Sequence, residues 1–359
     1  MSADEPVIEL ENVDVHFDQK GFLDTIMSRD VPYVHALDDV NLEVPPRDVV
    51  ALVGESGCGK TTLGKTMIGL QRPTAGSVKY RGQDIWEARD GGPDVDIPFA
   101  DIRRSLQIIH QDPGSSLNPN KRVMAILERP LKRWEPGMAS EDREARIKRL
   151  LERVELQPVD DYAQRFPHQL SGGEKQRVAL VRALLMNPDV ILADEAVSAL
   201  DVSLRVDMMD LMLDLQDEFD TSFLFVSHDL SNARYFAENA GGRIGVMYLG
   251  EIVEIGPAQQ VLDNPTHPYT KILKWATPAM NPDVAEQEAG DRPPLRRIDI
   301  PDATNPPEGC RFHTRCPEAR EACRNQHPEL YEVEGNGQVA QCFRAEADHE
   351  YWESPPIEE

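Results

Sequence analysis

The sequence predicts an α/β fold, and three observations support that prediction. A continuous apolar run, Val49–Val53, precedes a glycine-rich loop and a helical pattern over Lys60–Leu70, as expected of a strand buried on both faces. Two more apolar runs, Val190–Ala193 and Phe223–Val226, lie on either side of a helical pattern around Leu204–Phe219. Strands that alternate with helices build a parallel or mixed sheet with right-handed crossovers.

The N-terminal region predicts two half-buried strands. Apolar and polar residues alternate over Val7–Phe17, give way to a polar insertion that contains Gly21 and Pro32, and alternate again over Ala36–Val44. Pro45-Pro46 ends the second strand.

The rest of the chain suggests where its parts begin and end. Residues 112–172 are mostly helical in character, which predicts a helical subdomain. Gly256-Pro257 and the Pro-rich stretch Pro278–Pro307 predict a linker, beyond which lies a Cys-bearing tail. We therefore expect a first domain over residues 1–270 and a separate C-terminal extension over residues 271–359.

The composition is acidic. Sixty-three acidic residues against 38 basic ones give the 359-residue chain a net charge of −25, spread along its length. Such a surface keeps proteins soluble at high salt, so we expect a halophilic source, with an acidic mesophilic protein as the alternative. A nucleic-acid partner is not expected, because it would need a basic face.

The longest apolar runs fall far short of the roughly 20 residues that span a bilayer. The N-terminus also lacks the apolar segment of a secretory signal. We therefore expect a cytoplasmic protein that reaches a membrane only by docking on a partner.

The glycine-rich loop Gly54–Thr61 fits the pattern G-x-x-x-x-G-K-[ST] between a buried strand and a helix. Its backbone N–H groups can surround phosphates, Lys60 can neutralise the β- and γ-phosphates, and the Thr61 hydroxyl can bind Mg²⁺. We expect Cys58 to be a small filler residue of this phosphate loop. The candidate nucleotide-binding residues here are Gly54, Glu55, Ser56, Gly57, Cys58, Gly59, Lys60, Thr61 and Thr62.

Two carboxylates follow the apolar run Val190–Ala193. Asp194 at the end of the strand can hold Mg²⁺, and Glu195, one residue further, can polarise the attacking water. By themselves, two adjacent acids could be a solvated strand end. Because a phosphate loop lies upstream, we interpret the two acids as catalytic and Mg²⁺-binding residues.

A second anion-binding pattern, Leu-Ser-Gly-Gly-Glu, begins at Leu170. Ser171 and the two glycines stand before a helix, so a hydroxyl, free N–H groups and a helix N-terminus come together. One chain already has its phosphate loop. The second anion-binding pattern therefore predicts a nucleotide that is shared between two chains.

These motifs, in this order, resemble the ATP-binding subunits of ABC transporters over about residues 7–270. The resemblance implies a P-loop NTPase of ABC type, with a core parallel or mixed sheet, an antiparallel β subdomain and a helical subdomain. It also implies a head-to-tail dimer with two ATP at its interface. Ser171 and Gly173 would then act on the partner's ATP, and Asp201 would cross the interface.

The same resemblance assigns three further residues. His228, after the strand Phe223–Val226, matches the histidine that contacts the γ-phosphate. Gln111 matches the hinge glutamine that links Mg²⁺ and the attacking water to the helical subdomain. Phe17 is the expected adenine-stacking aromatic, with Tyr33 as the alternative.

The stretch Thr61–Lys65 resembles the second of the two ATPases of the oligopeptide, dipeptide and nickel importers, and several other segments resemble this group of importers in general. They are Gln111–Pro119, Phe166–Leu170, Asn264–Thr270 and Gly309–Pro317. The resemblance implies a second ATPase chain, with a heterodimer expected and a homodimer as the alternative. It also implies two permeases, an extracytoplasmic solute-binding protein and a place at the cytoplasmic face of the membrane. The transported solute stays open.

Four Cys lie in the extension with the spacing C-x5-C-x6-C-x18-C. Four thiolates can hold Zn²⁺ or a [4Fe–4S] cluster, and the spacing matches neither the short zinc pattern nor the familiar ferredoxin patterns. The resemblance favours the iron–sulfur cluster, with zinc and with free or disulfide-bonded thiols as the alternatives. The four ligands would be Cys310, Cys316, Cys323 and Cys342.

The sequence thus predicts an ATPase that energises an importer of peptides or a related solute. Two alternatives come from other classes of protein. One is an ABC ATPase that acts on nucleic acid or the ribosome, and the other is a redox- or metal-sensing regulatory ATPase.

Overall fold

The computed structural model describes residues 5–18, 33–277, 295–296, 299–333, 335 and 337–357. It divides into two compact units. Unit 1 comprises Met1–Val7, Val44–Asp48 and Tyr80–Val226, and unit 2 comprises Ile8–Glu43, Val49–Lys79 and Ser227–Glu359.

Unit 1 contains three parallel strands in the order β8-β7-β6, with Leu192 paired to Leu224 on one side and to Ile108 on the other. β7 and β8 are buried along their whole length, as their continuous apolar sequences predict. The elements of this part are β5 (Gln83–Asp84), α3 (Ile85–Asp90), α4 (Phe99–Ser105), β6 (Leu106–Ile109), β7 (Val190–Asp194), α10 (Val202–Phe219) and β8 (Ser222–Val226).

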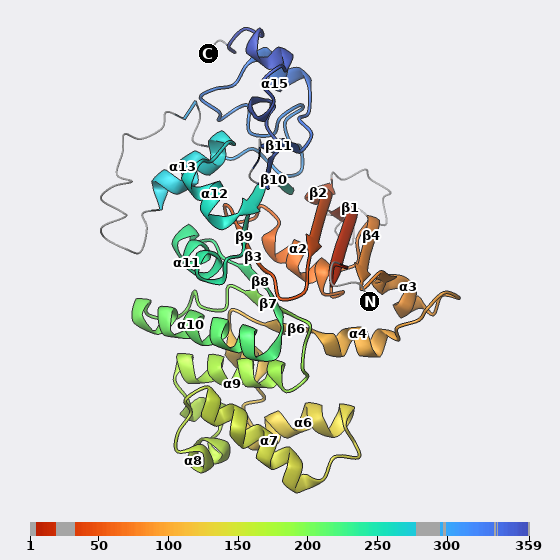
Figure 1. The fold of residues 1–359 in the computed structure, drawn as a ribbon, viewed down its shortest axis with the longest axis vertical. Coiled ribbons are helices and arrows are strands. Elements are labelled where there is room, and N and C mark those ends of the chain that lie inside the picture. The colour runs from red at the N-terminus through yellow and green to blue at the C-terminus, as the bar shows by residue number, and fades with distance from the viewer. Residues whose placement is uncertain are drawn as a thin grey trace, which may run out of the picture. The chain divides into compact units, whose positions relative to one another are not determined.

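The region predicted to be helical is helical, and Figure 1 shows its helices packed side by side in unit 1. Buried leucines and isoleucines at helical spacing, such as Ile147 and Leu151 of α7, form its core. The helices are α5 (Pro113–Ser116), α6 (Val123–Trp134), α7 (Ser140–Arg153), α8 (Val159–Gln164), the 3₁₀ turn η1 (Pro167–Gln169) and α9 (Gly172–Leu184).

Unit 2 holds strands in the order β11-β12-β10-β9-β3. β3 and β9 are parallel, and the pairs β9–β10, β10–β12 and β12–β11 are antiparallel. The strands are β3 (Val49–Val53), β9 (Arg243–Tyr248), β10 (Glu251–Pro257), β11 (Tyr331–Val333) and β12 (Gln338–Ala340). The helices are α2 (Lys60–Met67), α11 (Leu230–Ala240), α12 (Ala258–Asp263), α13 (Pro268–Ala276) and α15 (Glu321–Asn325), followed by the 3₁₀ turns η2 (Phe343–Ala345) and η3 (Glu350–Trp352).

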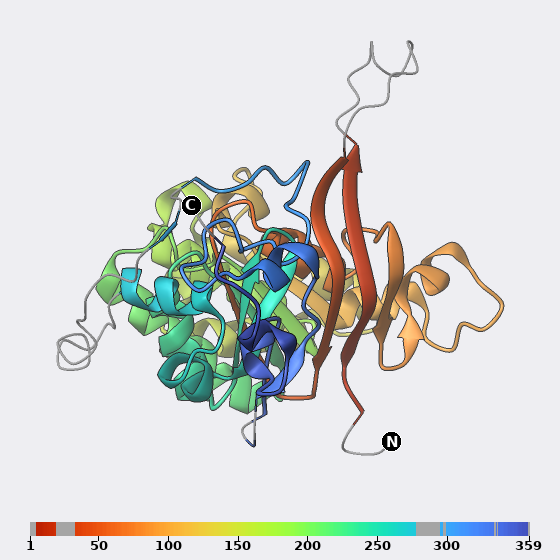
Figure 2. The same ribbon diagram turned by 90° about the horizontal axis from the view of Figure 1, so that it is seen from above.

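A second sheet in unit 2 contains the strands β2-β1-β4. Figure 2 shows the two long N-terminal strands running side by side. Buried and exposed side chains alternate along β1, as its sequence predicts. The strands are β1 (Ile8–Asp18), β2 (Tyr33–Val44) and β4 (Ala75–Tyr80).

The structure confirms the α/β prediction and corrects two details. Gly256-Pro257 is no linker, because β10 pairs with β9 through both residues, which lie opposite Ile244 and Arg243. The extension is not separate either, because its strand β12 pairs with β10. Most of Pro278–Pro307, and the predicted insertion around Gly21, lie outside the described residues. None of the helices described here meets the length and apolarity needed to cross a membrane.

Candidate functional site

The phosphate loop leads from β3 into α2 in unit 2. Gly54 and Gly59 have φ angles of 154° and 111°, which favour glycine. A Cβ at Gly54 would lie 2.2 Å from the carbonyl oxygen of Met247, and one at Gly59 would lie 2.3 Å from that of Ala36. Both glycines are therefore required by the close packing of the loop on β9 and β2.

Lys60 extends back along the phosphate loop. Its buried ammonium group donates to the carbonyl oxygens of Gly54 at 2.8 Å and Glu55 at 3.0 Å. The Cys58 sulfur lies 3.6 Å from Lys60 Nζ, and burial raises the pKa of this thiol. Cys58 is thus a buried, neutral side chain that fills space beneath the loop, as its sequence position predicts.

Unit 1 links Gln111 to the backbone of Glu195 through hydrogen bonds. Asp194 ends β7, and Glu195 has a φ of 51° in the turn that follows. The Ser198 hydroxyl donates to the carbonyl oxygen of Glu195 at 2.9 Å and accepts from Gln111 Nε2 at 3.3 Å. Gln176 on α9 donates to the carbonyl oxygen of Gln111 at 3.2 Å. A movement of Gln111 is therefore linked to the turn that carries Glu195.

Ser171 caps α9 in a reciprocal arrangement with Glu174. The Ser171 hydroxyl accepts from the Glu174 N–H at 3.2 Å, and the Glu174 carboxylate accepts from the Ser171 N–H at 2.6 Å. Tyr162 donates to the other oxygen of that carboxylate at 2.5 Å. The fold thus holds the exposed Ser171 loop firmly at a helix N-terminus.

The two glycines of this loop differ from those of the phosphate loop. A Cβ at Gly172 or Gly173 would make only ordinary contacts, at 3.9 Å from Leu200. Nearby, α10 begins after the exposed Asp201 with two exposed apolar residues, Val202 and Leu204. Packing within the chain therefore does not explain why both of these positions carry glycine.

The remaining nucleotide-site candidates lie in unit 2 and stay predictions. His228 is exposed and directly precedes Asp229, the N-cap of α11. Phe17, near the end of β1, and Tyr33, at the start of β2, are 39% and 48% exposed.

The extension gathers its four thiols. Cys310, Cys316, Cys323 and Cys342 are all free, and the Cys310 N–H donates to the carbonyl oxygen of Cys323 at 2.8 Å. Burial, followed by the proximity of the three other Cys, raises the pKa of Cys310, and burial raises that of Cys342 to about 12. Cys316 and Cys323 are buried, and Cys310 and Cys342 are partly buried. Clustered thiols with little exposure fit a metal group, whose positive charge would stabilise their thiolates.

The sequence did not reveal a contact between the extension and the phosphate loop. Arg315, adjacent to Cys316, donates from Nη1 and Nη2 to the two carboxylate oxygens of Glu55 at 2.8 and 2.9 Å. Burial alone would lower the pKa of Arg315, but its hydrogen bonds to Glu55 and Tyr248 raise it.

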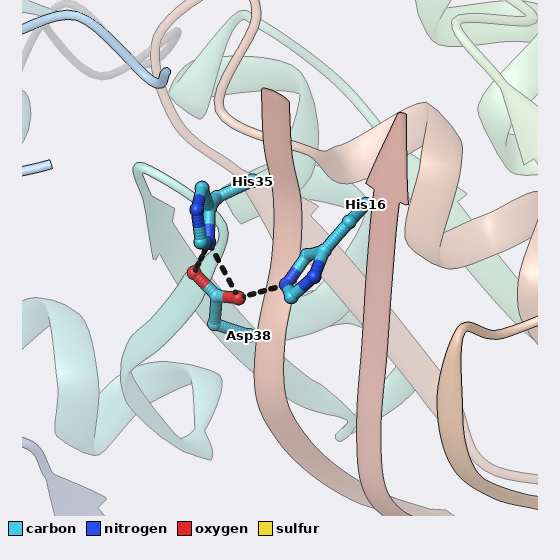
Figure 3. A group of neighbouring side chains, drawn as sticks. All are labelled: His16, His35 and Asp38. Atoms are coloured by element: carbon cyan, nitrogen blue, oxygen red, sulfur yellow. Dashed lines mark hydrogen bonds and ion pairs between the residues drawn. The ribbon is translucent and has the colours of Figure 1, made fainter. Parts of the chain in front are cut away.

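The extension also contacts β2, at Asp38, which lies beside His16 and His35 (Figure 3). His16 Nε2 and His35 Nδ1 lie 2.5 and 3.1 Å from the same oxygen of Asp38, and Arg311 of the extension pairs with its other oxygen. Two His and one Asp are possible metal ligands. Because Arg311 already supplies a positive charge to this carboxylate, we interpret the group as an ion-paired contact.

Comparisons with known proteins agree with this arrangement. The sequence model of the ABC transporter family matches residues 37–198. The sequence model of the family called oligopeptide/dipeptide transporter, C-terminal region, matches residues 253–323. The oligopeptide transport ATP-binding protein AppF of Bacillus subtilis is 39% identical, over 92% of this chain and 94% of its own. The dipeptide transport ATP-binding protein DppF of Escherichia coli is 40% identical, over 88% of each chain.

Among solved structures, the dimeric ATP-binding cassette MJ0796 in a post-hydrolysis state with ADP and Pi is similar. It is 29% identical with a TM-score of 0.57, over 70% of this chain and 98% of its own. CbiO1 of Clostridium perfringens, at 23% identity and a TM-score of 0.59 over 72% of this chain and 92% of its own, shares the fold. The chain therefore belongs to the ABC transporter family, as an ATPase of the oligopeptide/dipeptide transport ATP-binding type.

Proposed function

We propose that this chain hydrolyses ATP to drive the uptake of peptides through partner permeases. The observation that carries the proposal is the similarity, over nearly the whole chain, to proteins named for oligopeptide and dipeptide transport. The chain would work at the cytoplasmic face of the membrane, with a second homologous ATPase and an extracytoplasmic solute-binding protein. A high-salt source fits its net charge of −25.

Mg²⁺-ATP would be bound by this chain and cleaved with help from its partner. Lys60 would neutralise the β- and γ-phosphates, while Thr61, Asp194 and Gln111 hold Mg²⁺, directly or through water. Glu195 would polarise the attacking water, with His228 contacting the γ-phosphate.

The partner chain would close the site. We propose that Ser171 and Gly173 bind the γ-phosphate held by the partner, and that Asp201 crosses the interface. The two glycines that chain packing leaves unexplained, and the exposed Val202 and Leu204, support this arrangement.

A groove in unit 1 is the proposed docking site for a cytoplasmic helix of a permease. It has a volume of about 1060 Å³ and is lined by α4, α6 and α9. Its wall carries a single acidic residue, Glu128, against six basic ones. Burial and the neighbouring Arg129 lower the pKa of Arg182, which shows how closely the like charges are grouped. The basic residues are Arg103, Lys121, Arg129, Lys132, Arg133 and Arg182.

The groove predicts a charge-reversal effect. Arg129→Glu should weaken binding to the permeases on the order of tenfold, because a basic groove in an acidic protein favours an acidic partner segment. Purification through a tag on this chain, from its own membrane, should then recover less permease. Arg149→Glu, an equal charge change on α7, should recover permeases as the wild type does. Equal recovery with both variants would contradict docking at the groove.

We propose that the four Cys hold a [4Fe–4S] cluster. Within the described residues, three candidate ligand atoms lie within 4.8 Å of one another only at His16, His35 and Asp38, so no three of the four sulfurs lie that close together. Four sulfurs around one zinc would be about 3.8 Å apart, since each Zn–S bond is about 2.3 Å. A cuboidal cluster binds each Cys at a different iron, so it needs sulfurs that lie further apart than those around one zinc. The distances between the four sulfurs therefore favour the cluster over zinc.

Anaerobically purified protein should be brown and contain about four irons per chain. Cys316→Ser should remove most of the colour, because it deletes one ligand, whereas Cys58→Ser should keep the colour. Iron analysis and the absorption spectrum are the measurements. One tightly bound zinc in colourless protein would contradict the cluster, and four freely alkylated thiols in metal-free protein would contradict any metal site.

A further inference from the structure

Arg315 connects the extension to the phosphate loop through a partly buried ion pair with Glu55. The residue is 4% exposed, and its two amino groups bind both oxygens of the Glu55 carboxylate. Its guanidinium group also lies 5.7 Å from the ring centroids of Tyr248 and Phe312. A bidentate contact of this kind fixes the orientation of the guanidinium group relative to the carboxylate as well as the distance between them.

Each polar group of Glu55 makes a hydrogen bond. Its N–H donates to the Tyr269 hydroxyl at 2.9 Å, its carbonyl oxygen accepts from Lys60 at 3.0 Å, and its carboxylate accepts from Arg315. The same residue therefore contacts both the phosphate-binding ammonium group and the extension. A shift of its carboxylate would be passed to the backbone that Lys60 contacts.

The aromatic residues around this contact are packed as one group. The rings of Tyr248 and Tyr269 are 4.8 Å apart, and Phe312 lies 5.2 and 5.4 Å from them. All three are almost fully buried. Phe312 belongs to the extension, so the extension forms part of the wall behind the phosphate loop.

A second arginine of the same short segment anchors it independently. Arg311 pairs with Asp38 on β2 and with Glu251 on β10 at 2.9 Å. β2 is also the strand whose Ala36 carbonyl packs against Gly59 of the phosphate loop. The segment between Cys310 and Cys316 is therefore attached both to the phosphate loop and to the strands β2 and β10.

We propose that Arg315 is a positioning residue for ATP binding, which acts by holding the phosphate loop through Glu55. Arg315 itself is not proposed to touch the nucleotide. Because Arg315 is adjacent to Cys316, the Cys group and ATP binding should also be coupled, a consequence that rests on the proposed cluster. Coupling of two binding sites is reciprocal, so ATP should stabilise the Cys group as much as the Cys group favours ATP.

Arg315→Met should weaken ATP binding about tenfold, within the usual range for coupled sites. Glu55→Gln should have a similar effect, and the double variant should be no worse than either, because both remove one contact. KM should rise while kcat changes little, since a loosened loop weakens binding without altering the attacking group. Arg315→Lys should rescue only in part, because lysine keeps the charge but not the planar fork.

Arg324→Met is the matched control, since Arg324 is an exposed arginine of the same extension whose ion pair, with Glu321, lies within α15. It should bind ATP as the wild type does. Wild-type ATP affinity in both Arg315→Met and Glu55→Gln, or additive losses in the double variant, would overturn the proposal. So would a fall in kcat at constant KM, which would indicate a smaller fraction of folded protein.

The coupling to the Cys group has its own readout. Release of iron to a chelator should be slower with a non-hydrolysable ATP analogue in the wild type, and the analogue should not protect Arg315→Met. Equal release rates with and without the analogue in the wild type would overturn the coupling. Protein that contains no metal would end the cluster proposal, whereas the affinities of the Arg315 and Glu55 variants would still decide the role of Arg315.

Discussion

Glu195→Gln should lower steady-state ATP hydrolysis by a factor on the order of 10²–10⁴, the usual contribution of a general base. The glutamine side chain has the same length and nearly the same shape as glutamate, but its amide cannot polarise the attacking water. ATP affinity should stay close to that of the wild type, because the phosphate loop supplies the binding groups. ATP should therefore accumulate uncleaved on the variant and hold two chains together.

Phosphate release and nucleotide binding should be measured on the same preparation. Glu141→Gln is a suitable control, since Glu141 is exposed on α7 and the change removes the same charge. It should hydrolyse ATP at the wild-type rate. Normal turnover by Glu195→Gln would show that another group activates the water.

Ser171→Arg should abolish hydrolysis at the ATP that the partner holds. The long side chain would fill the space in front of the α9 N-terminus, where the N–H groups and the hydroxyl are proposed to meet the γ-phosphate. ATP binding at this chain's own phosphate loop should survive, because Ser171 is proposed to act only in trans. Ser140→Arg at the start of α7 places the same side chain at another helix start and should be active.

Mixing two inactive variants separates action in trans from action in cis. This test applies to a homodimer, the alternative to pairing with a second ATPase. In a head-to-tail homodimer of Ser171→Arg with Glu195→Gln, one site has an intact Glu195 and an intact Ser171, whereas the other has neither. Activity should therefore reappear in mixtures of the two variants. If Ser171→Arg instead lost ATP affinity at its own phosphate loop, the shared site would be wrong.

The sequence predicted those parts of the protein that depend on local pattern. Gly54 and Gly59 occur in a loop motif, and the structure shows that a Cβ at either position would collide with backbone. The runs around Leu192 and Leu224 form buried parallel strands because no polar side chain interrupts them. These signals are short in sequence, so one chain is enough to detect them.

The contacts that the sequence could not predict join residues far apart in the chain. Glu55 and Arg315 are 260 positions apart, and nothing near either residue indicates the other. Gly256-Pro257 suggested a linker because both residues usually end structure, yet β10 runs through them as far as Pro257. The same limitation produced the expectation of a separate extension, which the β10–β12 pairing contradicts.

Transport by the reconstituted complex would test whether ATP hydrolysis by this chain drives peptide uptake. The complex purified through a tag on this chain should be placed in lipid vesicles, with ATP supplied to the ATPase face and the solute-binding protein and a labelled peptide to the other. We expect ATP-dependent movement of the peptide across the membrane that disappears with Glu195→Gln. Peptide movement that persists with Glu195→Gln, or rapid ATP hydrolysis with no peptide moved, would contradict it.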